Sequence, residues 1–254
     1  MLFPPRSRRT AASLLFSQTR LAMVLACLVV LWVALVGCGS AAAPVSSGGG
    51  AAATPTPRPP YVFVAIGASE TFGTGADHPA TENWPMDLSS SLPRGAQVIN
   101  LGIPGITAQG ALQGELPEAL DARPDLVTVW LGTNDIIDKV NLANYQRSLD
   151  SILAQLTASG HVRVAVANIP DLTILPRFYA FDQAALTTQV QQWNKVVARE
   201  VSAHHIILVD VYGHSSEILG HPEYLSGDGL HPSTLGYVKV ANLFYQVLHA
   251  NGVI

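Results

Sequence analysis

From residue 61 onward, short runs of consecutive apolar residues alternate with longer segments in which apolar residues recur every three or four positions. The short runs are typical of strands buried on both faces, and the longer segments are typical of amphipathic helices. This pattern predicts five strands, at Tyr61–Ile66, Gln97–Asn100, Leu126–Leu131, Arg163–Asn168 and Ile206–Val209. It predicts four helices, at Ala108–Leu120, Asp135–Thr157, Asp182–Ala203 and Pro232–Ala250. Because strands that alternate with helices form parallel sheets, we expect an α/β domain with a five-stranded parallel sheet.

The first 60 residues have a different pattern. Four arginines, the last of them Arg20, precede an uncharged, largely apolar run over 21–36, which is the arrangement of an export signal. The run continues into Leu-Val-Gly-Cys, ending at Cys38, and this stretch resembles the lipobox of bacterial lipoproteins. That resemblance implies a signal peptide over 1–38 and acylation of Cys38, which becomes the new N-terminus. An uncleaved signal anchor is the alternative.

Residues 39–60 are rich in alanine, glycine and proline and have few large apolar side chains, so we expect a flexible tether there. The remaining residues, 61–254, form one predicted domain, since no internal repeat or second linker divides them. Together these segments predict an exported protein that is lipid-anchored to the outer face of a bacterial membrane, in the cell envelope. The sequence says nothing about its oligomeric state.

Composition narrows the chemistry of the domain. Both cysteines, Cys27 and Cys38, precede it, so it has no internal disulfide and no cysteine-based zinc site. It carries nine basic and eighteen acidic residues, a net charge of −9, which disfavours nucleic acid as a partner. The spacing of its histidines and Asp210 matches no common metal-ligand pattern, and we expect neither a metal nor a cofactor. The histidines considered were His204, His205, His214 and His221.

Candidate catalytic groups stand at the two ends of the domain. Ser69 follows the first predicted strand on a glycine-flanked turn, where a nucleophile would lie close to helix N-terminal amides. Near the other end, Asp228 precedes His231 by three residues. In one tight turn the carboxylate can fix the imidazole tautomer and leave the other ring nitrogen free to accept a proton from serine. Read singly, Ser69 could be a turn former and the Asp228–His231 pair a helix cap with a surface histidine.

Two further loops suit the binding of an oxyanion. Gly102 follows the second predicted strand, and Asn134 follows the third. A glycine allows its backbone N–H to approach a ligand closely, and an asparagine amide is a neutral donor. Apolar residues that follow strand ends belong either to a substrate pocket or to the ordinary core: Ile103, Ile136, Leu172, Ile174 and Leu175.

Ser69, Gly102, Asn134 and His231, in this order, resemble the four sequence blocks of the GDSL/SGNH hydrolases. The most specific parts of the resemblance are Gly-Thr-Asn-Asp at 132–135 and Asp-Gly-Leu-His-Pro at 228–232, and it extends over the whole of 61–254. It implies a flavodoxin-like three-layer α/β/α sandwich and a metal-independent serine esterase. Ser69 would be the nucleophile, His231 the base and Asp228 its partner. The N–H groups of Ser69 and Gly102 and the Asn134 amide would form the oxyanion hole.

The first block departs from the family pattern, because Gly-Ala-Ser-Glu at 67–70 replaces Gly-Asp-Ser-Leu. The serine is retained, so catalysis should survive, but Glu70 could alter the nucleophile or repel anionic substrates. The resemblance implies short-chain acyl esters, acetylated glycans or lysolipids as substrates. Two other hypotheses are open: a carbohydrate- or lipid-binding lipoprotein without turnover, and an acyltransferase that uses the same residues.

Overall fold

The computed structural model describes residues 58–254. The predicted signal peptide over 1–38, Cys38 and nearly all of the predicted tether over 39–60 lie outside the described residues. Among the helices of the part that is described, none is both long enough and apolar enough to cross a membrane.

Five parallel strands form a single sheet with the order β2-β1-β3-β4-β5. The strands are β1 (Val62–Gly67), β2 (Gln97–Asn100), β3 (Leu126–Trp130), β4 (Arg163–Ala167) and β5 (Ile207–Val209). Residues of β1 and β3 are buried throughout, as expected for central strands covered on both faces. The predicted α/β fold with a five-stranded parallel sheet is confirmed, and each strand lies within two residues of its predicted bounds.

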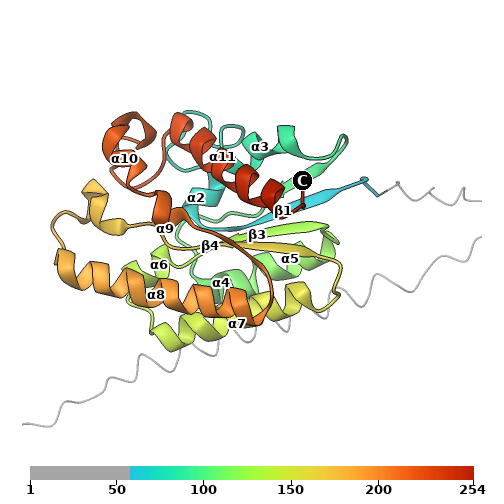
Figure 1. The fold of residues 1–254 in the computed structure, drawn as a ribbon, viewed down its shortest axis with the longest axis horizontal. Coiled ribbons are helices and arrows are strands. Elements are labelled where there is room, and N and C mark those ends of the chain that lie inside the picture. Colours follow the sequence, from blue (N-terminus) through green and yellow to red (C-terminus); the bar gives the residue numbers. More distant parts are fainter. Residues whose placement is uncertain (1–57) are drawn as a thin grey trace, which may run out of the picture. The chain divides into compact units, whose positions relative to one another are not determined.

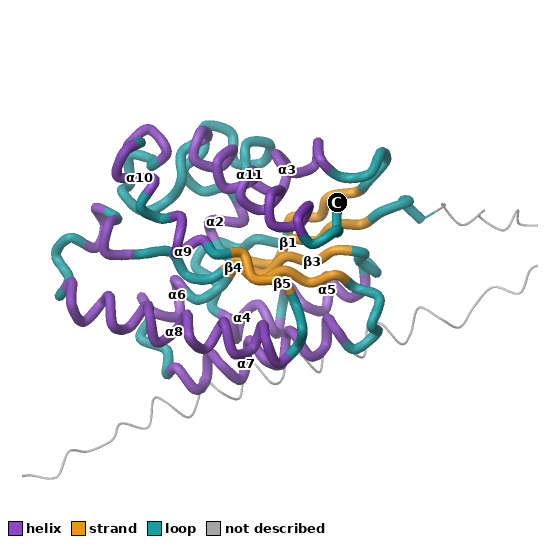
Figure 2. The backbone as a smooth tube through the Cα atoms, in the orientation of Figure 1, coloured by secondary structure: helices purple, strands orange, loops and turns teal. Residues whose placement is uncertain are grey.

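Helices cover both faces of this sheet and make three layers (Figures 1 and 2). On one face lie α4 (Ala108–Gln113), α5 (Glu115–Asp121), α7 (Leu142–Thr157) and α8 (Gln183–Ala203). On the other face lie α3 (Trp84–Leu88) and α11 (Thr234–Ala250). Alternate residues of β1 enter the two cores: Val64 and Ile66 face α7 and α8, whereas Phe63 and Ala65 pack with Trp84 and its partners on the second face.

Aromatic side chains anchor both layers to the sheet. On the second face, Trp84 of α3 stacks on Phe244 of α11, with ring centroids 3.9 Å apart. On the first face, Tyr145 of α7 contacts Trp193 of α8 at 4.6 Å. Fully buried aromatic side chains supply a large share of the burial free energy of a core. These pairs join α7 to α8 on one face of the sheet and α3 to α11 on the other.

Two of the predicted helices are each divided into two helices in the structure, and a third begins two residues later than predicted. The helix predicted over 108–120 is two helices, α4 and α5, separated at Gly114. The helix predicted over 135–157 is also two, because α6 (Thr133–Ile137) ends before Asn141, whose side chain caps α7 by accepting from the N–H of Ala143. The last helix starts at Thr234 rather than 232, where Ser233 caps it.

Several short elements were not predicted. They are α2 (Ser69–Phe72), α3, α9 (Val211–His214) and α10 (Glu217–Gly220), with single 3₁₀ turns at Ser89–Ser91, Leu172–Ile174, Pro176–Phe178 and Pro222–Tyr224. Segments of three to five residues are too short to show a helical period in sequence. The turns at Leu172–Ile174 and Pro176–Phe178 belong to the loop after β4, and α9 and α10 belong to the loop after β5.

Candidate active site

The predicted catalytic residues gather at the carboxyl edge of the sheet. Strand order reverses between β1 and β3, so the loops after these two strands diverge and leave a crevice between them. Ser69 follows β1, Gly102 follows β2 and Asn134 follows β3. The loop before α11 brings His231 to the same edge from the far end of the chain.

The turn that carries Ser69 is held by close backbone packing. A Cβ on Gly67 would lie 2.8 Å from the backbone oxygen of Trp130 and closer still to the Thr71 hydroxyl, so only glycine fits between β1 and β3 there. Ser69 is the first residue of α2, and its N–H therefore has no carbonyl one turn earlier to bind. Gly73 ends α2 in the left-handed conformation, with φ of 104°. The serine is thus fixed on a rigid corner and is 7% exposed.

Asp228 and His231 are organised by contacts within their own loop. One oxygen of Asp228 accepts from the N–H groups of Leu230 and His231, at 2.8 and 3.0 Å, and from the Ser226 hydroxyl at 2.8 Å. The other oxygen lies 2.6 Å from Nδ1 of His231. The N–H of Ser226 donates back to the carbonyl of His231 at 2.9 Å and closes the turn.

These bonds set the charge and the tautomer of the pair. Partial burial raises the pKa of the Asp228 carboxyl, but the donors from His231, Leu230 and Ser226 outweigh it, and the pKa lies well below the ordinary value. An ionised carboxylate only accepts, so Nδ1 of His231 carries the proton and Nε2 is free to accept. Nε2 lies 2.9 Å from Oγ of Ser69. The structure therefore joins Ser69, His231 and Asp228 in one hydrogen-bonded series across 162 residues of sequence.

Gly102 lies against the serine turn. A Cβ at this position would come within 2.4 Å of the Phe72 nitrogen and 2.8 Å of the Thr71 carbonyl carbon, both of which are backbone atoms. The N–H of Gly102 donates to Oδ1 of Asn100 at 3.0 Å, and the Asn100 amide donates to the carbonyl of Thr71 at 2.6 Å. Asn100 therefore links the Gly102 loop to α2. Its side-chain oxygen also accepts from the Gly102 N–H, which is the group predicted to bind an oxyanion.

Asn134 is the second residue of α6, and its side-chain amide nitrogen donates to the carbonyl of Ile106 at 3.0 Å. An amide has two N–H groups, so one is left that this bond does not use. The neighbouring Asp135 accepts from the N–H of Ala108 at 3.0 Å. Burial raises the pKa of Asp135 to about 6, although the bond from Ala108 opposes the rise. These two contacts tie the loop after β3 to the start of α4.

Sequence reasoning missed three residues that shape the site. Asn100 ends β2 and clamps the Gly102 loop, as described above. Glu115 is 1% exposed, and burial raises its pKa to about 8 against the backbone N–H groups of Gly67 and Ile103, which lower it. Asp135 anchors α4. The sequence does show that Asn100 ends a strand and that Glu115 and Asp135 lie near helix starts. These positions do not predict which backbone group each side chain will contact.

A largely apolar cavity of about 140 Å³ lies beside the catalytic groups. Glu70, next to the serine, and Leu230 and Pro232, on either side of the histidine, are among its lining residues. Of the five apolar residues considered for a pocket, Leu172 and Leu175 line this cavity and the other three do not. Ile103 is 48% exposed, and Ile136 is buried in the core. The cavity is closed elsewhere by α11 and by the residues around α9 and α10.

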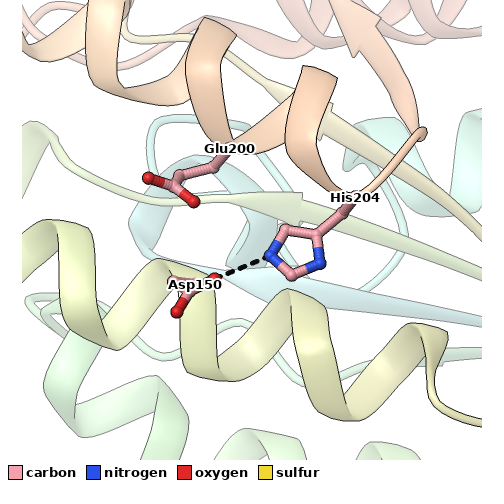
Figure 3. A group of neighbouring side chains, drawn as sticks. All are labelled: Asp150, Glu200 and His204. Carbon is pink, nitrogen blue, oxygen red and sulfur yellow. Dashed lines mark hydrogen bonds and ion pairs between the residues drawn. The ribbon is translucent and has the colours of Figure 1, made fainter.

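A separate group of possible metal ligands lies between α7 and α8, away from the catalytic edge (Figure 3). One ligand atom from each of Asp150, Glu200 and His204 lies within 4.8 Å of the other two. His204 Nε2 is paired with Asp150 at 2.8 Å, and Gln146 donates to Glu200 at 2.8 Å. These contacts hold α7 and α8 together without an ion. The catalytic edge contains no comparable ligand group within 58–254.

Comparison with known proteins identifies the family. The model of the GDSL-like Lipase/Acylhydrolase family matches residues 65–239. The chain belongs to this family. All five predicted catalytic and oxyanion residues fall inside the matched range.

Relatives and solved structures agree with the family. An acetylxylan esterase of Xylanibacter ruminicola is 26% identical over 216 residues, which is 74% of this chain and 43% of the relative. An acetylxylan esterase of Geobacillus stearothermophilus is 24% identical over 159 residues, 60% of this chain and 72% of the relative. The chain thus spans less than half the length of the first of these relatives.

Solved structures of the family share the fold. The lipase/acylhydrolase from Enterococcus faecalis has a TM-score of 0.62 and 24% identity, covering 75% of this chain and 96% of that one. A catalytic mutant of an acetylxylan esterase from Geobacillus stearothermophilus has a TM-score of 0.61 and 20% identity, covering 75% of this chain and 94% of the other. At this level of identity the likeness concerns the fold.

Proposed function

We propose that this protein hydrolyses carboxylic esters through an acyl-enzyme on Ser69. The observation that carries the proposal is the series of hydrogen bonds from Ser69 to His231 to Asp228, at 2.9 and 2.6 Å. A nucleophile, a base within reach of it and a group that orients the base are the three parts of a serine hydrolase. Membership in the GDSL-like family supports the same assignment.

In the first half of the proposed reaction, Oγ of Ser69 attacks the ester carbonyl while Nε2 of His231 takes its proton. The carbonyl oxygen becomes an oxyanion, which the N–H groups of Ser69 and Gly102 and the amide of Asn134 stabilise. Because the N–H of Gly102 donates to Asn100 in the free protein, it must exchange or share that bond when the substrate oxygen arrives. The imidazolium then protonates the alcohol as it leaves.

In the second half, water attacks the acyl-enzyme, and His231 removes a proton from that water and returns it to Oγ. Asp228 stays ionised throughout and stabilises the positive imidazole. We infer that esters of small acyl groups on glycans are the main substrate class, since two relatives are acetylxylan esterases.

We also propose that the protein is exported and held at the outer face of a bacterial membrane by lipid on Cys38, with 39–60 as a tether. The arginine-rich start, the apolar run over 21–36 and the Leu-Val-Gly-Cys sequence support this proposal. Its test is metabolic labelling with an alkyne fatty acid, which should mark the full-length protein and not Cys38→Ala. Labelling of both proteins, or of neither, would contradict the anchor.

The catalytic proposal is tested with the full-length protein, p-nitrophenyl esters of acetate to decanoate and a fluorophosphonate probe. We expect probe labelling and turnover in the natural protein, highest on the short esters. Ser69→Ala should lower kcat by about ten-thousandfold or more and abolish labelling. Ser216→Ala, which removes an exposed hydroxyl outside the hydrogen-bonded series, is the control, and it should still be labelled.

Two results would contradict this proposal. Turnover that survives in Ser69→Ala would assign the nucleophile to another residue. Absence of both labelling and turnover in the natural protein, tested over all acyl lengths and on acetylated xylan, would favour a binding protein on the same fold. Circular dichroism of each variant shows whether loss of activity reflects loss of structure.

A further inference from the structure

Glu70 is a buried acid beside the nucleophile, and the catalytic series gives its carboxylate no role. Its side chain is buried, with the residue 8% exposed, and it sits directly after the nucleophile at the start of α2. Within 58–254, the carboxylate has one hydrogen-bond partner, the Ser69 hydroxyl, 3.3 Å from Oε2. That hydroxyl lies closer to Nε2 of His231, at 2.9 Å. Since a serine has a single proton, a serine that donates to His231 leaves Glu70 without a donor.

A buried carboxylate without a donor is costly, and a bound ligand that supplies one relieves that cost. Glu70 faces a space where a ligand can do this, because it is a lining residue of the cavity, whereas Ser69, to which it is hydrogen-bonded, is not. Most other lining residues near the histidine are apolar, such as Leu230, Pro232 and Trp130. The lining also includes polar side chains, and two of them, Glu217 and Lys239, are paired with each other at 2.7 Å.

The cavity also has a suitable size. A volume of about 140 Å³ is close to the roughly 150 Å³ that holds a benzene ring. A six-membered ring with one hydroxyl therefore fits both the apolar walls and the single carboxylate. A long unbranched acyl chain would bring methylene groups against Glu70 and remove it from water with no donor in exchange.

We propose that Glu70 is a specificity-determining residue that accepts a hydrogen bond from a hydroxyl next to the ester in the substrate. This inference rests on the proposed esterase function and deepens it: the preferred substrates are monoesters of ring polyols in which the neighbouring hydroxyl is free. The Leu that stands in this place in the family's Gly-Asp-Ser-Leu pattern cannot accept a hydrogen bond. With Glu70 in place of that Leu, the enzyme can recognise a hydroxyl group on the alcohol part of the ester.

Cyclic acetates that differ at one atom test the inference in the full-length protein. The series is cyclohexyl acetate and its trans-2-hydroxy, trans-2-methoxy and trans-2-fluoro forms, with acetate release as the measurement. We expect kcat/KM to be about tenfold to a hundredfold higher for the hydroxy ester than for the other three. The methoxy and fluoro groups can accept but cannot donate, so size and polarity alone do not give this order.

Variants then assign the preference to the carboxylate. Glu70→Leu should bring the hydroxy-to-cyclohexyl ratio to about one, and Glu70→Gln, which keeps a neutral carbonyl acceptor, should give an intermediate ratio. Glu118→Gln removes an exposed acid on α5 and should keep the full ratio. The ratio is informative because a general loss of structure or of catalysis lowers all four rates together.

The possible results separate the inference from the proposed function. Equal rates for the hydroxy and methoxy esters in the natural protein, or an unchanged ratio in Glu70→Leu, would overturn the role of Glu70 while leaving the esterase in place. If the Glu70 variants do not fold, the four-ester series of the natural protein decides alone. Failure to hydrolyse any ester would overturn the esterase itself and the inference with it.

Discussion

The two halves of the catalytic series are held in place by different means. The serine turn depends on distant segments: Gly67 fits only because it packs against β3, and Gly102 packs against the backbone of α2. The acid–base loop depends on itself, since Asp228 binds atoms of residues within three positions of it. The position of the nucleophile therefore depends on the packing of the sheet, whereas the position of the base depends on the contacts of a single turn. A change in the first region should alter folding and activity together, and a change in the second should alter activity alone.

Asp228→Asn changes the acid–base loop and should lower kcat more than Gly102→Ala or Asn100→Ala. The amide keeps the shape but can donate to Nδ1 of His231, which favours the wrong tautomer and loses the stabilisation of the imidazolium. We expect kcat to fall by about a thousandfold to ten-thousandfold. The Asp228 side chain is 44% exposed, so the melting temperature should change little. A large fall in the melting temperature would show that the loop supports the fold as well.

Gly102→Ala should break the first region, and here stability should fall with activity. The new Cβ meets backbone atoms of Thr71 and Phe72 that cannot rotate away, so the oxyanion loop must move from the serine. We expect a loss of about a hundredfold to a thousandfold in kcat, together with a lower melting temperature. Gly114→Ala, where the added Cβ makes only an ordinary contact at 3.4 Å, is the matched control. Equal behaviour of the two variants would refute the packing argument.

Asn100→Ala should have a smaller effect that tests the link between β2 and α2. It removes the bond to the Thr71 carbonyl and the acceptor for the Gly102 N–H. We expect unfolding free energy to fall by about 1–3 kcal/mol and kcat to fall roughly tenfold as the loop loosens. Hydrogen exchange of the Gly102 N–H should become faster. If kcat rises instead, Asn100 competes with the substrate for that N–H rather than positioning it.

Glu115→Gln should leave activity at pH 7 almost unchanged and should alter how stability depends on pH. Burial raises the pKa of Glu115 from 4.5 to about 8, so the folded state binds this proton more tightly than the unfolded state. The resulting stability is fully present below about pH 4.5 and is lost as pH rises through 8. Urea unfolding at pH 5 and pH 9 should therefore show Glu115→Gln gaining roughly 3–5 kcal/mol relative to the natural protein at the higher pH. Parallel stability curves would contradict the buried acid.

The sequence predicted the sheet well because its strands are buried on both faces. Residues of β1 and β3 form short, largely apolar runs between loops, and such a length favours a buried strand over a helix. Helix ends were predicted less well, since α6 and α7 share one apolar period and only the cap at Asn141 separates them. Capping depends on backbone angles that tertiary contacts decide.

Within the site, the sequence placed the residues but not their contacts. Asp228 and His231 were predictable as a pair because three residues of one turn suffice to join them. The bond from the Asn100 amide to the Thr71 carbonyl was not, because it depends on where β2 and α2 lie relative to each other. Contacts between distant segments become visible only in three dimensions.

The parallel sheet gives the domain two opposite poles. The chain enters beside the amino ends of the strands, where Arg58 is tied to Asp125 at 2.9 Å, and Ser69 stands at the far end of β1. Six strand residues separate these points by roughly 20 Å. An attachment through the N-terminal segment, as proposed, would hold the domain by the pole away from its crevice. The span of the tether would then set how far from the envelope an insoluble polymer can be reached.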